Sequence, residues 1–172
     1  MRNLEAKFRL RDVDDARARA LAIGYSDRAL LHQRDTFFRV PKGKLKLREE
    51  PSGAWLIHYG REVRDSLQLS QYEIVPIADA AATRAMMSAT LGVIAEVRKE
   101  RTLLMRANVR LHLDRVEGLG LFGEIEAVIA DGEDPERSRA AVDELLAVLG
   151  IARGDLIDVS YFELAAQAAP PK

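Results

Sequence analysis

The 172-residue chain contains no cysteine and has no marked excess of charge of either sign. The absence of cysteine excludes disulfides and zinc–thiolate sites. Lysine and arginine number 26 against 27 aspartates and glutamates, whereas a general nucleic-acid-binding protein usually carries a basic excess. No apolar run is long enough to span a bilayer, and the N-terminal MRNLEAKFRLRDVDD lacks the apolar core of a signal peptide. We therefore expect a cytoplasmic globular protein that binds neither nucleic acid nor membrane.

The remaining composition is that of a chain able to fold around one core. Hydrophobic residues make up 48% of the sequence and charged residues 31%, so the chain can bury a core and stay hydrated outside. Its length fits one domain better than two. We expect a single domain over residues 1–167 and a disordered tail over 168–172. A homodimer is compatible with this organisation.

Short segments with strand character dominate the chain. They alternate polar and apolar residues or are rich in β-branched and aromatic residues, and turn residues separate them. The predicted strands are 2–10, 34–40, 44–49, 54–60, 71–77, 96–105, 107–116 and 121–130. Such a series of short connections favours an antiparallel sheet that is strongly curved or closed.

Three segments predict helices. Asp12 and Asp79 are typical N-caps, and the Asp134-Pro135 pair is a strong helix start. The predicted helices are 13–22, 79–94 and 136–149, with a last short helical segment within 155–167. Together with the strands they predict an α+β domain.

Side-chain alternation places charges of one sign together on several strand faces. The groups sharing a face are Glu5 with Lys7; Lys44 with Lys46 and Arg48; Lys99 with Arg101; Arg110 with His112 and Asp114; and Glu124 with Glu126. A solvated sheet face is the ordinary explanation of one such strand. Like charges on one strand face repel, however, and a bound polyanion relieves that repulsion. Basic walls beside paired carboxylates suit phosphate oxygens and a hard divalent cation.

Several stretches resemble the CYTH domain, also called the triphosphate tunnel metalloenzyme family. They are NLEAKFRL, RDTFFRVPKGKLKLRE, VRKERTLL and NVRLHLDRVEGLGLFGEIEAVI, which occur in the family's order along nearly the whole chain. The class IV adenylyl cyclase-like members are the branch that they resemble most. The resemblance implies an eight-stranded antiparallel β-tunnel, closed like a barrel, with helices packed outside.

The resemblance also implies site residues. Ligands of Mg²⁺ or Mn²⁺ would be Glu5, Asp114, Glu124 and Glu126. Contacts to the triphosphate would come from Lys7, Lys46, Arg48, Lys99, Arg101 and Arg110. Lys44 sits at a turn, where it can lie outside the tunnel, and Asn3 replaces the first carboxylate of the family's Glu-x-Glu-x-Lys strand. That replacement weakens the case for a second metal ion. The resemblance identifies no catalytic residue.

Three functions fit this reading. The favoured one is cyclisation of ATP to cyclic AMP and pyrophosphate. The second is hydrolysis of inorganic triphosphate or of an organic one such as thiamine triphosphate, and the third is non-catalytic binding of a nucleotide or polyphosphate, for which Asn3 is the best argument. His112 is expected to orient other groups, Tyr161 to pack, and His58 to pack or line the wall.

Overall fold

The computed structural model describes residues 2–64, 67–129 and 135–168. The strands are β1 (Arg2–Arg9), β2 (Ser26–Phe38), β3 (Lys44–Glu50), β4 (Gly53–Arg64), β5 (Leu67–Ile77), β6 (Val93–Arg106), β7 (Val109–Val116) and β8 (Gly120–Ile129). The helices are α1 (Val13–Ala22), α2 (Ala80–Leu91), α3 (Pro135–Leu149) and α4 (Tyr161–Ala168), preceded by one 3-10 turn, η1 (Arg153–Asp155). The described residues thus form the expected α+β fold.

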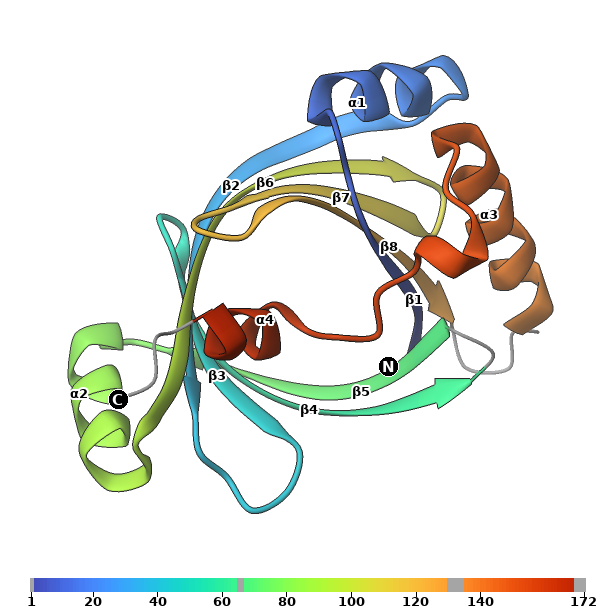
Figure 1. Cartoon of the computed structure of the whole chain (residues 1–172). Coiled ribbons are helices and arrows are strands. Elements are labelled where there is room, and N and C mark those ends of the chain that lie inside the picture. The colour runs from blue at the N-terminus through green and yellow to red at the C-terminus, as the bar shows by residue number, and fades with distance from the viewer. Residues whose placement is uncertain (1, 65–66, 130–134, 169–172) are drawn as a thin grey trace.

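All strand pairs are antiparallel, in the order β1-β5-β4-β3-β2-β6-β7-β8 with β1 also paired to β8. The sheet therefore curls round on itself, as Figure 1 shows. Its seam is short, because among the described residues β1 meets β5 over only four pairs, Arg2–Glu5 against Gln68–Gln71, whereas β1 meets β8 over eight. The expected antiparallel sheet is thus present and is curled into a half-barrel, in which β1 and β5 pair only at this short seam.

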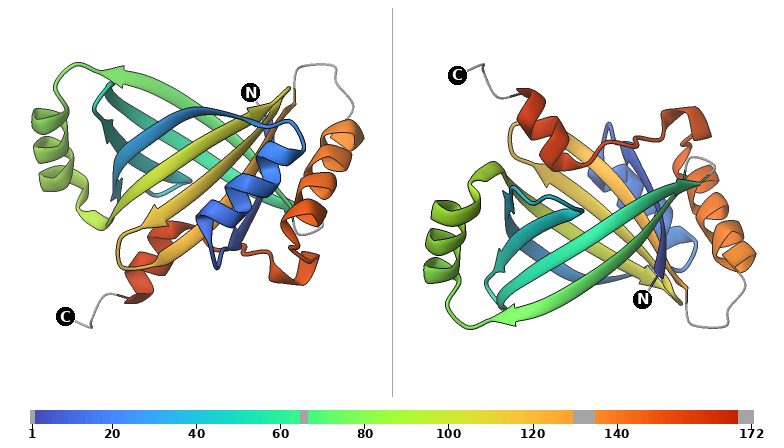
Figure 2. Two further views of the ribbon diagram at one scale, coloured as in Figure 1. Left: turned by 90° about the horizontal axis from the view of Figure 1, so that it is seen from above. Right: turned by 90° about the horizontal axis from the view of Figure 1, so that it is seen from below.

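The helices cover the outer face of the sheet at two places, and α4 lies across one opening (Figures 1 and 2). Helices α1 and α3 pack on β1, β7 and β8 around Phe8, Leu111 and Leu145. Helix α2 packs on the β2–β4 region around Phe38 and Leu47. The apolar outer faces of the strands are thereby buried, which leaves the charged faces turned inward.

Helix boundaries follow their capping residues. The Asp12 carboxylate accepts from the amides of Asp14 and Asp15 at the start of α1, and that of Asp79 accepts from the Ala82 amide at the start of α2. The predicted helix 79–94 was too long at its C-terminal end. Gly92, at φ 76°, ends α2 after Leu91, and the chain enters β6 at once.

Strand β2 begins eight residues earlier than the sequence predicts, at Ser26 rather than residue 34. Its first part pairs with β6 alone, since β3 reaches only Arg34. Side chains there are largely exposed on the outside and partly exposed inside. The apolar alternation that marks a strand is therefore weak in this part.

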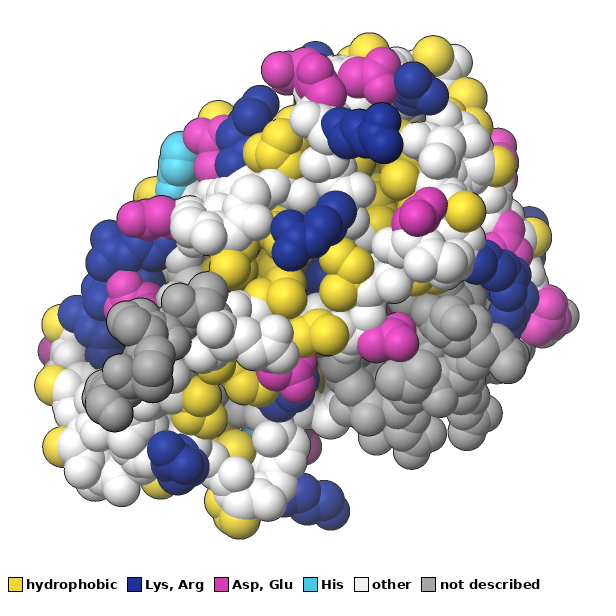
Figure 3. All heavy atoms as spheres, in the orientation of Figure 1, with side chains coloured by type: hydrophobic (Ala, Val, Ile, Leu, Met, Phe, Trp, Pro, Cys, Tyr) yellow, Lys and Arg dark blue, Asp and Glu magenta, His cyan; other side chains and the backbone are white. Residues whose placement is uncertain are grey.

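Helix α4 confirms the short helical segment predicted near the C-terminus and packs against β6. In Figure 3 hydrophobic side chains gather in the middle of the face that carries α4, with charged side chains around them. The predicted tail, 168–172, lies outside the described residues except for Ala168, the last residue of α4. No helix among the described residues is both long and apolar enough to cross a membrane.

Candidate functional site

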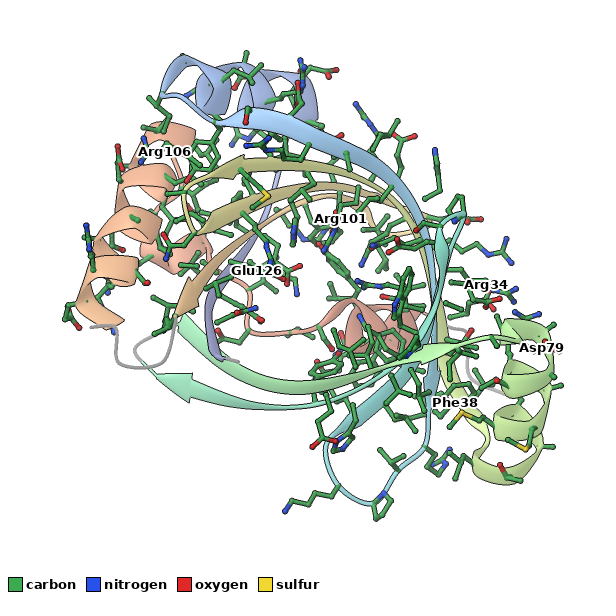
Figure 4. All side chains as sticks on the ribbon, turned by 180° about the vertical axis from the view of Figure 1, so that it is seen from behind. Arg34, Phe38, Asp79, Arg101, Arg106 and Glu126 are labelled. Atoms are coloured by element: carbon green, nitrogen blue, oxygen red, sulfur yellow. The ribbon has the colours of Figure 1, made fainter. Side chains whose placement is uncertain are left out.

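A cavity of about 460 Å³ lies inside the curled sheet. Nine of the ten predicted site residues line it, namely Glu5, Lys7, Lys46, Arg48, Lys99, Arg101, Arg110, Glu124 and Glu126. Asp114 is not among the lining residues. Figure 4 shows Arg101 and Glu126 inside the curled sheet and Arg34 outside it. The strand faces are therefore oriented as alternation predicts.

The basic wall of the cavity is organised around a buried carboxylate, Asp35. Arg48 donates two hydrogen bonds to it, each 2.7 Å long, Lys46 Nζ lies 3.0 Å away, and Lys99 Nζ lies 3.6 Å away. Burial alone would raise the pKa of Asp35, but Arg48, Lys46 and Lys99 hold it well below its usual value. Asp35 thus stays ionised and holds the charged ends of three cationic side chains in one region of the cavity.

Two of these cations hold their charge weakly. Burial, followed by the nearby Arg101, lowers the pKa of Lys99 to about 7. Burial, followed by Arg48, lowers the pKa of Lys46 to about 8. One carboxylate is too little anionic charge for one buried and two half-buried cations. Additional negative charge, of the kind that a phosphate chain carries, would therefore stabilise the charged forms of these lysines.

Arg101 joins the basic wall to the acidic corner. It donates two 2.7 Å hydrogen bonds to Asp114 and one of 2.8 Å to Glu124. Asp114 is fully buried, and its Oδ2 also accepts from the Tyr161 hydroxyl at 2.9 Å. Because both oxygens are occupied in this way, Asp114 holds Arg101 in place from behind the cavity wall. Its assignment as a metal ligand stays a prediction.

The acidic corner forms where β1, β7 and β8 meet. Strand register places Glu5 opposite Glu126, and Lys7 and His112 opposite Glu124. Glu124 forms a 3.0 Å ion pair with Lys7 in addition to its bond from Arg101. Glu126 is less tightly held, with Arg110 at 3.6 Å and His112 Nδ1 at 3.7 Å. Glu126 is accordingly the more available oxygen ligand of the two.

The donor set of this corner fits a divalent cation. One nitrogen of His112 and one oxygen each of Glu124 and Glu126 lie within 4.8 Å of one another. His112 Nδ1 and Asn3 Oδ1 are buried without a hydrogen-bond partner in the described part of the chain. A cation held here would use His112, Glu126 and Glu124, and it would neutralise phosphate charge and lower the pKa of an attacking oxygen.

Several cavity residues were absent from the predicted site. Asp35 lies in the Asp-x-Phe-Phe stretch that supports the resemblance, and alternation with Phe37 would have turned it inward. Its pairing with the Lys46 and Arg48 side chains depends on cross-strand register, which the sequence does not reveal. Leu31, Leu103 and Met105 also line the cavity, where inward-facing apolar residues are indistinguishable by sequence from core residues.

Lys44, His58 and Tyr161 were also considered from the sequence. Lys44 lies outside the cavity lining, which agrees with its position at a turn. Its Nζ is 3.2 Å from Glu163 and 3.3 Å from Ser160 on the α4 side. His58 is exposed, with Nε2 3.2 Å from the Lys42 carbonyl, so it neither packs inside nor lines the cavity. Tyr161 packs edge-on against Phe122, as expected, and its hydroxyl donates a hydrogen bond to Asp114.

The curled antiparallel sheet thus encloses a cavity with a cluster of cations around Asp35 and a corner of carboxylates around Glu124 and Glu126, a pairing of charges that complements a metal-bound polyphosphate. The whole-chain comparison agrees, because the model of the CYTH domain matches residues 1–161. The chain belongs to the CYTH family. It is 30% identical over 133 residues to a protein of Methanocaldococcus jannaschii named "Putative adenylate cyclase", a match that covers 76% of this chain and 75% of that protein.

Solved structures show the same fold. A protein from Pyrococcus horikoshii, 21% identical, superposes with a TM-score of 0.84 over 94% of this chain and 98% of that one. A Hippeastrum protein, 16% identical, superposes with a TM-score of 0.69 over 98% and 97% of the two chains. That protein is described as a "Putative adenylyl cyclase" that reveals a dominant triphosphatase activity. At these identities the likeness concerns the fold alone.

Proposed function

We propose that this chain is a metal-dependent enzyme of the class IV adenylyl cyclase type, which converts ATP to cyclic AMP and pyrophosphate. The supporting observation is that apolar side chains share the cavity with the charged groups. Leu31, Leu103 and Met105 line it from β2 and β6, and Ile57 and Ile74 line it from β4 and β5. Inorganic triphosphate would leave these surfaces uncovered, whereas a nucleoside would bury them.

The order of side chains along the strands gives the substrate a direction. On β6 the inward residues run Lys99, Arg101, Leu103 and Met105, so cations give way to apolar side chains along one wall. Leu103 lies opposite His112 in the β6–β7 register. The β- and γ-phosphates would lie against Lys46, Arg48 and Lys99, and the α-phosphate near Arg101, close to the acidic corner. The nucleoside would then cover Leu103 and Met105.

In this arrangement the chain acts by binding and positioning. The ribose 3′ oxygen attacks the α-phosphorus, the bond from that phosphorus to the bridging oxygen of the β-phosphate breaks, and pyrophosphate leaves with the negative charge. The hydroxyl proton passes to solvent or buffer. Arg48 and Lys99 stabilise the departing pyrophosphate, and the sheet encloses the substrate as a tunnel with α4 across one opening.

Hydrolysis in the same cavity is the second candidate, because the apolar lining also suits an organic triphosphate such as thiamine triphosphate. The two reactions differ in which oxygen attacks and which phosphorus receives it. Non-catalytic binding is the third, and it rests on Asn3. This buried amide lines the cavity at the position where the family's strand carries a carboxylate.

A product assay separates the three. The full chain is incubated with ATP, thiamine triphosphate or inorganic triphosphate, with Mg²⁺ or Mn²⁺, and products are identified by chromatography. We expect cyclic AMP and pyrophosphate from ATP. Glu126→Gln should lose turnover, whereas Glu73→Gln should keep the turnover of the parent protein, because Glu73 is exposed and lies outside the cavity lining. Orthophosphate as the product would establish a triphosphatase instead, and intact substrate despite binding would establish a binder.

A further inference from the structure

His112 occupies an unusual position for a histidine that merely packs. It lies on β7 with its side chain 7% exposed, and Nδ1 is 3.7 Å from an oxygen of Glu124 and 3.7 Å from an oxygen of Glu126. These separations are too long for hydrogen bonds. Within the described residues Nδ1 has no hydrogen-bond partner. A buried nitrogen that makes no hydrogen bond is costly, and coordination of a metal ion would satisfy it.

The spacing of these three side chains suits one ion between them. Ligand atoms roughly 2.1 Å from a metal ion lie about 3.0 Å from one another at adjacent corners of an octahedron. The separations from His112 Nδ1 to the two carboxylates are 3.7 Å, and all three ligand atoms lie within 4.8 Å of one another. Changes of side-chain torsion that close these gaps would bring the three atoms onto one cation.

The charges that face this corner come from three strands. Lys7 of β1 and Arg101 of β6 contact Glu124, and Arg110 of β7 lies near Glu126. A cation must compete with them for the carboxylates. An imidazole nitrogen could also accept a hydrogen bond from such donors, but within the described residues none is made to His112 Nδ1. The imidazole is thus the ligand of the cluster that these cations leave available.

We infer that His112 is a direct ligand of the divalent cation and gives this site a preference for Mn²⁺ and Co²⁺ over Mg²⁺. Imidazole suits transition-metal ions, whereas Mg²⁺ favours oxygen ligands and retains its water. The inference rests on the proposed metal-dependent function and adds the identity of the ion. It also replaces the orienting role that the sequence suggested for His112.

Direct coordination is tested on the unaltered protein by NMR. The chain contains three histidines, His32, His58 and His112, so labelling with ¹⁵N-histidine gives a short, assignable spectrum. With ¹¹³Cd²⁺ and inorganic triphosphate added, we expect a one-bond ¹¹³Cd–¹⁵N coupling at Nδ1 of His112 and none at the other two. Absence of coupling with Cd²⁺ bound would overturn the inference, because the imidazole would then only orient its neighbours.

Selectivity is tested by calorimetric titration of Mn²⁺, Co²⁺ and Mg²⁺ in the presence of inorganic triphosphate. His112→Gln should weaken Mn²⁺ and Co²⁺ binding about tenfold or more and Mg²⁺ binding less than about threefold. His58→Gln, at an exposed position outside the cavity lining, should change neither. An equal loss for all three ions would contradict the inference. Full turnover of ATP in a chelator would instead overturn the proposed function, which keeps the two failures distinct.

Discussion

Lys99 is the cavity cation whose charge responds most to pH near neutrality, because burial and then Arg101 lower its pKa to about 7. A bound triphosphate favours the charged form and raises that pKa, so binding takes up a proton when the pH lies above the pKa of the free protein. We expect triphosphate affinity to fall as the pH rises from about 7 to 9, by at most about tenfold per pH unit from this group.

The matched variant is Lys99→Arg, which keeps its charge throughout that range. Calorimetry at several pH values, in buffers of different ionisation enthalpy, measures both affinity and proton uptake. The triphosphate's own titration contributes equally to both proteins, so the difference between them isolates Lys99. Identical pH profiles for the parent and Lys99→Arg would show that Lys99 is fully charged in the free cavity.

Arg48 carries a second prediction at the residue scale. Arg48→Ala removes a half-buried guanidinium of the basic wall, and each lost charge-assisted hydrogen bond to the triphosphate costs about 1.5–3 kcal/mol. We expect the Kd for inorganic triphosphate to rise at least tenfold. The control is Arg137→Ala, on the exposed side of α3, which should leave the Kd unchanged. Equal effects would mean that the phosphate chain does not reach β3.

Asp35 complicates that measurement in a predictable way. Removing Arg48 leaves the Asp35 carboxylate with Lys46 and Lys99 as its ion-pair partners within the described residues, and its less fully compensated charge would repel the ligand. The double variant Arg48→Ala with Asp35→Asn separates the two effects. If it binds triphosphate more tightly than Arg48→Ala alone, Asp35 is a competitor of the substrate for the wall as well as its organiser.

At the scale of elements, β8 depends on a close approach to β1. A Cβ atom built on Gly123 would lie 2.2 Å from the Phe8 ring, which is fully buried. Gly123→Ala should therefore force the two strands apart and destabilise the protein by about 1–3 kcal/mol or more. Thermal or urea unfolding measures this, with Gly154→Ala as control, since nothing lies within 4 Å of its added Cβ. A small effect at Gly123 would show that Phe8 can move aside.

The cavity-lining strands β3, β6 and β8 show which features of the site the sequence could predict and which it could not. Alternation placed Lys46 with Arg48, Lys99 with Arg101, and Glu124 with Glu126 on shared strand faces, because a strand turns every second side chain to the same face. The resemblance to the CYTH family then implied that these faces line a cavity. Alternation could not show that Glu124 pairs with Lys7 or that Asp114 supports Arg101, since those contacts depend on which strands are neighbours. The sequence therefore predicted the composition of the site, and only the fold supplied its pairings.

Segments with no face packed against a hydrophobic core were the hardest to predict. The first half of β2 has solvent on one side and an open cavity on the other, so the hydrophobic period of a strand is missing there. In the segment after Gly92 the opposite problem arises, because Val93 and Ile94 are apolar yet exposed. They extend the pattern of α2 by composition, and only the left-handed backbone of Gly92 ends the helix.

On the scale of the whole molecule, a net charge of −1 conceals an interior in which one region is rich in cations and another is rich in carboxylates, the latter partly neutralised by Lys7, Arg101 and Arg110. Lys46, Arg48 and Lys99 gather around one carboxylate on the β2, β3 and β6 side, and Glu5, Glu124 and Glu126 gather on the β1 and β8 side. A triphosphate with a divalent cation complements both sides at once. The two edges of the sheet lie between these groups, at the seam where β1 meets β5 over four residue pairs.

A ligand that spans the cavity should therefore fasten the seam. We expect inorganic triphosphate with Mn²⁺ to slow amide hydrogen exchange in β1, around Asn3 and Glu5, more than in the α3 core around Val142 and Leu145, which packs away from the cavity. At a hundredfold excess over Kd, binding adds about 2.7 kcal/mol to the free energy of unfolding, and this global gain protects all cooperative elements alike. Extra protection confined to β1 would show that the ligand stabilises the pairing of β1 with β5.

The Glu126→Gln variant, mixed with the same ligands at the same fractional occupancy, should lose that local excess while retaining the global gain, because the cation would no longer join β8 to the phosphate chain. Protection spread evenly over β1 and α3 in the parent protein would show that the edges of the sheet are already fixed before the ligand arrives.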